Sequence, residues 1–263
     1  MCRLFGLRAA SPASVRDALL THPNALRVQS KEHKDGWGIA YWEHPTATMQ
    51  HNMGLAPAFA DPNFEAVCSR VVARSVLAHV RLASVGAVEA QNAHPFREGR
   101  WAFAHNGTLH RFAEQQPALE ALLPSERRTR LRGETDSERC FQLFLSHLAD
   151  ADSPKNVRAV ATALALTMRS VEGLTDDVSG TSALNFLVTD GHVLVASRRG
   201  RSLFFATSSE TAAPAPGTRV EHFLVSSEAL HNNAPWHPVA DNELIGVDAD
   251  LSFHRWSLEE LAG

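Results

Sequence analysis

The sequence has few cysteines and no long hydrophobic run. Its three cysteines cannot all pair and none has a Cys-x-x-Cys spacing, which argues against a disulfide framework and a zinc ribbon. The longest uncharged apolar stretch, Ala159 to Met168, is far shorter than the roughly 20 residues that a membrane span needs. Arg3 and Arg8 bracket only four residues, too few for a secretory signal. We therefore expect a soluble, cytoplasmic protein that does not enter a membrane.

An excess of positive charge is also missing. The 25 Lys and Arg residues are outnumbered by 29 Asp and Glu, and no basic run exceeds short clusters, so nucleic acid is not an expected partner. The 14 histidines invite a metal hypothesis, but no His-Glu-x-x-His motif is present. The glycine-rich nucleotide motifs and the Gly-x-Ser-x-Gly elbow of serine hydrolases are absent too. The sequence predicts neither a metal nor a cofactor.

Apolar patterning and turn residues predict many short strands and a few helices. Strands are expected over 2–9, 36–43, 47–54, 75–84, 100–109, 203–207, 219–226 and 243–249. Helices are expected over 12–21, from Asp61 to about Arg74, from Thr135 to about Ala149, and from Ser153 onward. In the last of these helices, six apolar residues fall on one face at spacings of three and four: Val157, Val160, Ala161, Leu164, Met168 and Val171. Asp190-Gly191 lies between two apolar runs and indicates a hairpin. This order favours antiparallel sheets with helices packed outside, in one domain over 1–263.

Cys2 is the first candidate for chemistry. Initiator methionine is normally removed before a small second residue, so the mature chain would begin with a cysteine that carries a free α-amino group. A thiolate is a competent nucleophile, and the adjacent amine can act as its base. A small apolar residue in an edge strand is the alternative, and it would be preferred if Cys2 stood alone.

Three further motifs have both a catalytic and a plain structural interpretation. Arg81, late in a strand, could hold a carboxylate or form an internal ion pair. Asn106 and Gly107 could form an oxyanion hole or an ordinary turn. The acidic residues of 133–138 could cap a helix or bind an ammonium group. Taken together, the motifs suit cleavage of a γ-carboxamide on an amino-acid head group, with Arg81 on the α-carboxylate and Asp136 on the α-ammonium.

Six stretches in this order resemble the class II glutamine amidotransferases. They are Met1-Cys2, Asp35-Gly36-Trp37-Gly38-Ile39, His79-Val80-Arg81-Leu82-Ala83-Ser84, Asn92-Ala93-His94-Pro95-Phe96, His105-Asn106-Gly107-Thr108-Leu109 and Gly133-Glu134-Thr135-Asp136-Ser137-Glu138. Weaker similarities are Ser226-Ser227-Glu228 and Trp236-His237-Pro238-Val239, so the resemblance extends to about residue 240. It implies an N-terminal nucleophile hydrolase of the α+β class, a four-layer αββα sandwich of two antiparallel sheets between helical layers.

The resemblance also implies roles for individual residues. Cys2 matches the nucleophile and, through its α-amine, the base. Arg81 matches the arginine that grips the glutamine carboxylate, and Asp136 the carboxylate that receives the ammonium. The side chain of Asn106 and the backbone N–H of Gly107 match the oxyanion hole.

Three more residues in the matching motifs receive lesser roles. His94 and Trp37 would form a wall of the substrate site or position a loop, and a structural role suits both equally well. His105 precedes the oxyanion asparagine and would support it.

The predicted activity is hydrolysis of glutamine or a γ-glutamyl amide through a thioester on Cys2. The chain ends at Gly263 without room for a synthase domain, so it is more similar to short members that act on γ-glutamyl amides in ergothioneine assembly or glutathione breakdown. One alternative is the ammonia-supplying subunit of a partner synthase or transferase. Another is a non-catalytic glutamine sensor, which a retained Met1 would favour. The leaving group and the oligomeric state are left open.

Overall fold

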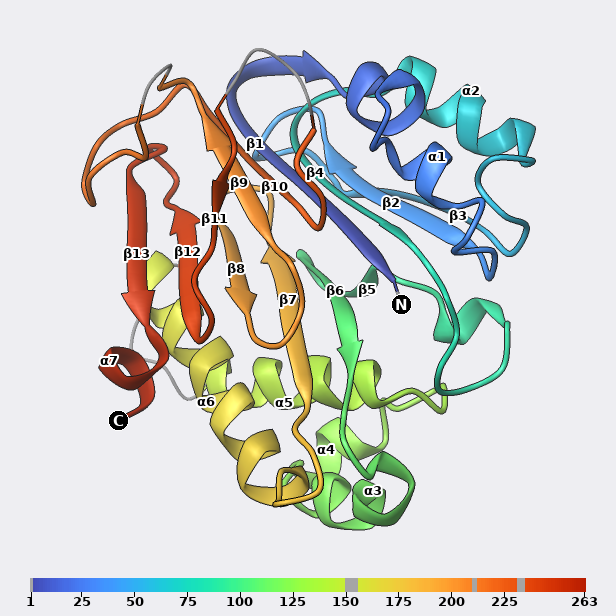
Figure 1. Ribbon diagram of the computed structural model, residues 1–263, viewed down its shortest axis with the longest axis vertical. Helices are drawn as coiled ribbons and strands as arrows, with labels where there is room; N and C mark the ends of the chain where they lie inside the picture. Colours follow the sequence, from blue (N-terminus) through green and yellow to red (C-terminus); the bar gives the residue numbers. More distant parts are fainter. Residues whose placement is uncertain (1, 150–155, 210–211, 231–234) are drawn as a thin grey trace.

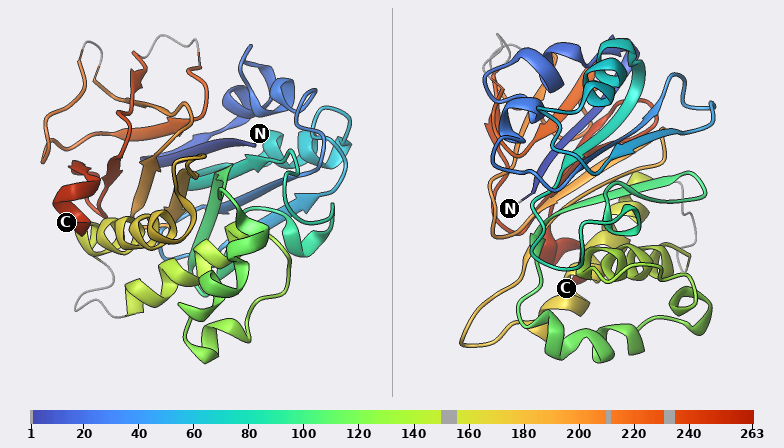
Figure 2. Two further views of the ribbon diagram at one scale, coloured as in Figure 1. Left: turned by 60° about the horizontal axis from the view of Figure 1, so that its bottom comes forward. Right: turned by 90° about the vertical axis from the view of Figure 1, so that its right-hand side faces the viewer.

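The computed structural model describes residues 2–149, 156–209, 212–230 and 235–263. Its centre consists of two antiparallel sheets packed face to face, with helices on the outer face of each (Figure 1). In the right-hand view of Figure 2, the N-terminal helices lie at the top, α5 and α6 at the bottom, and the sheets between them. The α+β sandwich implied by the resemblance is confirmed.

The larger sheet has seven strands in the order β11-β9-β10-β1-β4-β2-β3. Its strands are β1 (Arg3–Ser14), β2 (Trp37–Trp42), β3 (Gln50–Gly54), β4 (Val72–Val80), β9 (Phe204–Thr207), β10 (His222–Ser226) and β11 (His237–Pro238). The helical turn η1 (Asp17–Thr21) and the helices α1 (Leu26–Gln29) and α2 (Pro62–Arg70) cover its outer face. Side chains alternate along β1: Phe5 and Leu7 pack under these helices, whereas Leu4 packs between the sheets.

The smaller sheet has six strands in the order β13-β12-β8-β7-β6-β5. They are β5 (Phe96–Glu98), β6 (Trp101–Thr108), β7 (Ala183–Thr189), β8 (Leu194–Arg198), β12 (Glu243–Val247) and β13 (Phe253–Ser257). The helical elements of this half are η2 (Ala90–Asn92), α3 (Phe112–Ala121), α4 (Ser125–Arg128), α5 (Asp136–Ala149), α6 (Val157–Thr175) and α7 (Leu258–Ala262). Phe103 of the sheet packs against Phe141 and Phe144 of α5, and Phe186 packs against Phe103.

The strongest local predictions are confirmed. All six apolar positions predicted on one face of α6 are buried: Val157, Val160, Ala161, Leu164, Met168 and Val171. Asn156 caps this helix by accepting a hydrogen bond from the N–H of Arg158, and the predicted start at Ser153 lies outside the described residues. β7 and β8 pair across Asp190-Gly191, where Gly191 has a φ of 91°.

The predicted helix over 12–21 is wrong in its first half. β1 continues to Ser14, and after an irregularity that follows Arg8 it pairs Ala13 with Ala73 and Ser14 with Val72. The Ser-Pro signal of a helix start is therefore overridden by a strand partner about 60 residues away. Since β4 begins at Val72, α2 also ends at Arg70, earlier than predicted. The sequence patterns missed β5, β13, α3, α4 and α7.

No helix in the described ranges is long and apolar enough to cross a bilayer.

Candidate active site

The motif residues gather at one end of the two sheets. Cys2 directly precedes β1, Arg81 directly follows β4, and the ladder between these strands pairs Arg3 with Val80. Asn106 lies near the end of β6 in the other sheet, and Asp136 is the first residue of α5. The charges of Arg81 and Asp136 both act on the Cys2 thiol. The ends of strands from both sheets and the start of one helix therefore carry the expected site residues.

The Cys2 thiol is buried and protonated near neutral pH. The residue is 9% exposed, and its Sγ donates a hydrogen bond to the carbonyl of Leu82 at 3.6 Å. Burial raises the pKa of the thiol, and the neighbouring charge of Arg81 offsets only part of this effect. A reaction at Cys2 therefore needs a base that removes the proton as the sulfur attacks.

Arg81 binds backbone carbonyls and forms no ion pair within the described ranges. Its Nη1 donates to Ala87 O at 2.9 Å, and its Nη2 donates to Val85 O at 2.9 Å and Gly86 O at 3.3 Å. These bonds use three of the five guanidinium N–H groups. Backbone carbonyls therefore hold Arg81, in place of the internal ion pair that the sequence left open as an alternative. The buried guanidinium orders the loop over 85–87 and keeps two N–H groups for another acceptor.

Asp136 ties the start of α5 to the end of β6. Its Oδ2 accepts from the N–H of Leu109 at 2.9 Å, and its Oδ1 accepts from the N–H of Ser137 at 2.8 Å. The N-terminus of α5 is capped by Thr135, whose Oγ1 accepts a hydrogen bond from the N–H of Glu138 at 3.2 Å. The buried carboxylate of Asp136 thus lies beside the strand that carries Asn106.

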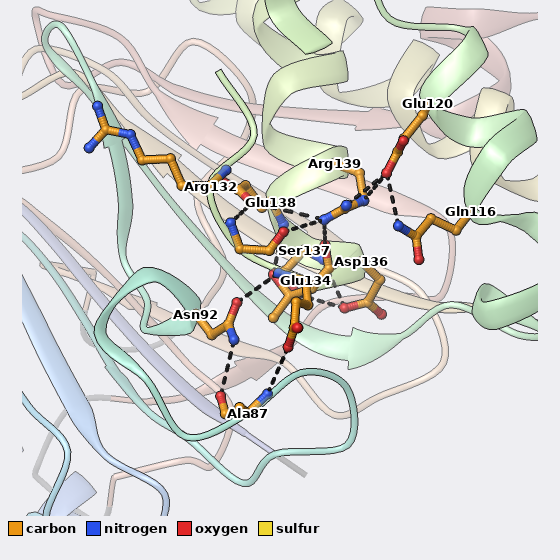
Figure 3. Close-up of polar contacts among 12 residues, drawn as sticks. Ala87, Asn92, Gln116, Glu120, Arg132, Glu134, Asp136, Ser137, Glu138 and Arg139 are labelled. Atoms are coloured by element: carbon orange, nitrogen blue, oxygen red, sulfur yellow. Dashed lines mark hydrogen bonds and ion pairs between the residues drawn. The ribbon is translucent and has the colours of Figure 1, made fainter. Parts of the chain in front are cut away.

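Two residues outside the predicted set join the Arg81 loop to the α5 start (Figure 3). The N–H of Ala87 donates to Glu134 Oε2 at 3.3 Å, and Asn92 Nδ2 donates to Ala87 O at 3.1 Å. Asn92 Oδ1 in turn accepts from the N–H of Glu134 at 3.0 Å. The loop bound by Arg81 and the segment before Asp136 are therefore fixed to each other. Both residues stand in matching motifs, but only their contacts reveal this role.

Asn106 and Gly107 lie inside a strand rather than in a turn. β6 pairs Asn106 with Asn185 and Gly107 with Leu184. Asn106 Nδ2 donates to Ser227 Oγ at 3.3 Å, whereas its buried Oδ1 has no hydrogen-bond partner among the described residues. The alternative of a turn is excluded, and a polar amide faces the interior between the sheets.

Gly107 occupies a position where no side chain fits. A Cβ there would lie 1.9 Å from the backbone oxygen of Ala183 and 2.4 Å from Nε2 of His105. We expect Gly107→Ala to lower the melting temperature, because overpacking against backbone costs about 1–3 kcal/mol. Gly173→Ala is the matched control: a Cβ there meets nothing within 4 Å, and alanine favours the helix. A Gly107→Ala protein that melts like the wild type would contradict this packing.

His105 precedes Asn106 in β6, and its side chain lies on the opposite face of this strand, toward α5. Its Nε2 lies 2.8 Å from the carbonyl of Ala183, which can only accept, so Nε2 carries the proton. Nδ1 forms a hydrogen bond with the hydroxyl of Ser137 at 2.9 Å. Burial lowers the pKa of His105, which keeps the ring neutral. His105 therefore joins β6 to β7 and α5.

His94 is stacked on a second buried histidine. The ring centroids of His79 and His94 are 4.3 Å apart, and neither nitrogen of the His94 ring has a hydrogen-bond partner in the described ranges. Burial lowers the pKa of both, to about 3 for His79. The carbonyl of His94 lies over Gly38, where a Cβ would be 2.1 Å from it.

Among the residues that the structure describes, no group of three or more His, Cys, Asp or Glu could hold a metal ion.

Trp37 is not brought together with Cys2. Its ring packs on Phe64 of α2 with centroids 5.1 Å apart, and its Nε1 donates to Asp61 Oδ2 at 2.8 Å. It belongs to the core between the larger sheet and the N-terminal helices. Alternation along β2 points Trp37 away from the inner face, so its observed contacts are structural.

Comparison with known proteins finds relatives over most of the chain. The model of a family described as class II glutamine amidotransferases matches residues 1–212. The chain is 28% identical over 293 residues to a probable glutamine amidotransferase of Saccharomyces cerevisiae, covering 94% of this chain and 82% of that one. It is also 28% identical over 258 residues to the γ-glutamyl-hercynylcysteine sulfoxide hydrolase of Mycobacterium tuberculosis, covering 94% and 93%.

A solved structure shares the fold. A glutamine aminotransferase class-II domain protein from Silicibacter pomeroyi superimposes with a TM-score of 0.68 at 22% identity, covering 97% of this chain and 99% of that one. The matched family model spans most of the chain. The protein therefore belongs to the class II glutamine amidotransferases and is an enzyme of amide hydrolysis.

Proposed function

We propose that the enzyme hydrolyses the γ-carboxamide of glutamine or of a γ-glutamyl amide, with Cys2 as the nucleophile. The observation that carries this proposal is the meeting of Cys2, Arg81, Asn106 and Asp136 at one end of the sandwich. The names of the relatives in yeast and Mycobacterium tuberculosis support the same substrate class. Removal of Met1 would expose the α-amine of Cys2 as the base that the buried thiol requires.

The proposed reaction has two steps. The α-amine takes the thiol proton while Sγ attacks the γ-carbon, and the resulting oxyanion is held by Asn106 Nδ2 and the N–H of Gly107. The C–N bond then breaks, and ammonia or an amine leaves with that proton. Water next attacks the γ-glutamyl thioester, which releases glutamate and returns the thiol.

The head group would be recognised by charges that are already in place. Arg81 has two N–H groups left for the α-carboxylate, and the Asp136 carboxylate offers its remaining lone pairs to the α-ammonium. Both groups are buried, which strengthens their interaction with an ionic ligand. Since γ-glutamyl compounds share this head group, the leaving amine would be selected elsewhere in the site.

The direct test is glutamate release from glutamine and a panel of γ-glutamyl amides, using protein whose intact mass shows that Met1 is absent. Glutamate release that depends on Cys2 supports the proposal, and the best substrate identifies the leaving group. No release from any member of the panel by Met1-free protein contradicts a self-sufficient hydrolase. In that case, activity restored by a second protein would instead indicate an ammonia-supplying subunit.

We expect Arg81→Lys to raise KM more than it lowers kcat. Lysine keeps the charge but lacks the planar fork and cannot hold the carbonyls of 85–87 in the same way. Loss of charged hydrogen bonds predicts a fall in kcat/KM of roughly 10- to 100-fold. Steady-state kinetics on the best amide measures this change. Arg27→Lys, in an exposed ion pair with Glu65, is the control, and an unchanged KM in Arg81→Lys would contradict the assignment.

A further inference from the structure

The segment that follows β10 holds the backbone of the first residues of the chain. Ser227 Oγ accepts from the N–H of Leu4 at 2.9 Å, and the N–H of Ser227 donates to Leu4 O at 3.1 Å. Glu228 forms an ion pair with Arg3 at 3.3 Å, and Arg3 Nη1 donates to the carbonyl of Cys2 at 3.2 Å. The position of Cys2 thus depends on residues more than 220 positions later in the chain.

The same serine also contacts the amide of Asn106. Ser227 Oγ accepts from Asn106 Nδ2 at 3.3 Å, and the serine is 0% exposed. With the bond from Leu4, both lone pairs of the hydroxyl oxygen are in use. Because Asn106 Oδ1 has no partner in the described ranges, the bond to Ser227 is the one that orients the amide. Nδ2 carries a second hydrogen, which this bond leaves free.

We propose that Ser227 is a positioning residue for the reaction, an inference that rests on the proposed function. Its hydroxyl joins the strand that carries Cys2 to the amide of Asn106 and directs the free Nδ2 hydrogen at the oxyanion that forms beside Sγ. Stabilisation of an oxyanion requires donors fixed in advance, since a displacement of about 1 Å costs much of the effect. One buried oxygen sets the distance between nucleophile and oxyanion donor.

The first test compares Ser227→Ala with Ser226→Ala. Ser226 is equally buried and its hydroxyl donates to Leu4 O at 3.4 Å, but no contact joins it to Asn106. Loss of the orienting bond in Ser227→Ala should lower kcat about tenfold with little change in KM. Ser226→Ala should change kcat by less than about threefold. Equal kcat values in the two variants would overturn the proposal.

A double-mutant cycle separates positioning from a general structural role. If Ser227 acts through Asn106, Ser227→Ala should cost less than about twofold when Asn106→Ala is already present. A full tenfold loss in that background would mean that Ser227 acts independently of Asn106, and it would overturn the proposal. Should Ser227→Ala fail to fold, the pair Ser227→Thr and Ser227→Val answers the same question, because these variants differ only in hydroxyl against methyl. Higher kcat in the threonine variant is expected.

A measurement without turnover distinguishes this inference from the proposed activity. The side-chain amide of Asn106 should shift in the ¹⁵N–¹H spectrum of Ser227→Ala and stay in place in Ser226→Ala. An unchanged amide signal in Ser227→Ala overturns the positioning role even if the enzyme proves to be a Cys2-dependent hydrolase. Failure of the wild type to release glutamate would refute the proposed function, and the amide spectrum would still decide whether Ser227 holds Asn106.

Discussion

Replacing Cys2 with alanine should reduce glutamate release to below about a thousandth of the wild-type rate. The substitution removes the thiol that precedes β1, and the other two cysteines, Cys68 and Cys140, lie in α2 and α5, so no thioester can form at this site. Burial raises the pKa of this thiol, so its reactivity depends on a proton acceptor held beside it. The measurement is glutamate release from the best γ-glutamyl amide, with substrate binding followed separately by calorimetry.

The matched control is Cys68→Ala. Cys68 lies fully buried in α2, and burial raises its pKa as well, but it packs among Phe64 and Val67 under the outer helices. Its loss should lower the melting temperature slightly and leave kcat within about twofold. Turnover that survives in Cys2→Ala, or disappears equally in Cys68→Ala, would refute Cys2 as the nucleophile.

Asn106→Ala should give the second largest loss, about 10²- to 10³-fold in kcat with a much smaller change in KM. In the proposed reaction, the free Nδ2 hydrogen binds the oxyanion more strongly than the ground-state carbonyl oxygen, so the loss of the amide raises the barrier more than it weakens substrate binding. Asn106→Asp should be at least as inactive, because a carboxylate would place negative charge beside the oxyanion. Both variants are measured by steady-state kinetics after their melting temperatures are compared.

Asn185→Ala provides the contrast, since Asn185 lies directly opposite Asn106 in the β6–β7 ladder. Its side chain binds the backbone of Arg199, Arg201 and Ser202. We expect it to lower stability by about 1–3 kcal/mol through buried groups left unpaired, with kcat of the folded protein within about threefold. Equal effects on kcat at Asn106 and Asn185 would contradict the oxyanion assignment.

Local patterns in the sequence predicted those features whose causes are local. The apolar face of α6 and the hairpin at Asp190-Gly191 depend on residues within a few positions of each other, and both are confirmed. The helix expected over 12–21 depended on a local Ser-Pro signal, and it failed where β4 supplied a strand partner. Pairing energy from a distant segment outweighs a weak local preference.

The candidate site shows the same contrast between features with local causes and features that distant segments decide. The order of the motifs was enough to identify the family, because each motif is a short string of specific residue types. It could not show which face of a strand a residue occupies. Trp37 stands in a matching motif, yet packs against α2 on the outer face of the larger sheet. Asn106-Gly107 looks like a turn dipeptide, yet it lies within β6 because β7 pairs with it.

By itself, the sequence determined the α+β class, the family and the set of chemical groups available for amide hydrolysis. Only the tertiary structure decided how these groups are held: the loop bound by Arg81 is fixed by Glu134, and the amide of Asn106 is fixed by Ser227. The physical reason is that residue types specify which bonds can form, whereas partners 40 to 220 positions apart are chosen by strand pairing and sheet packing.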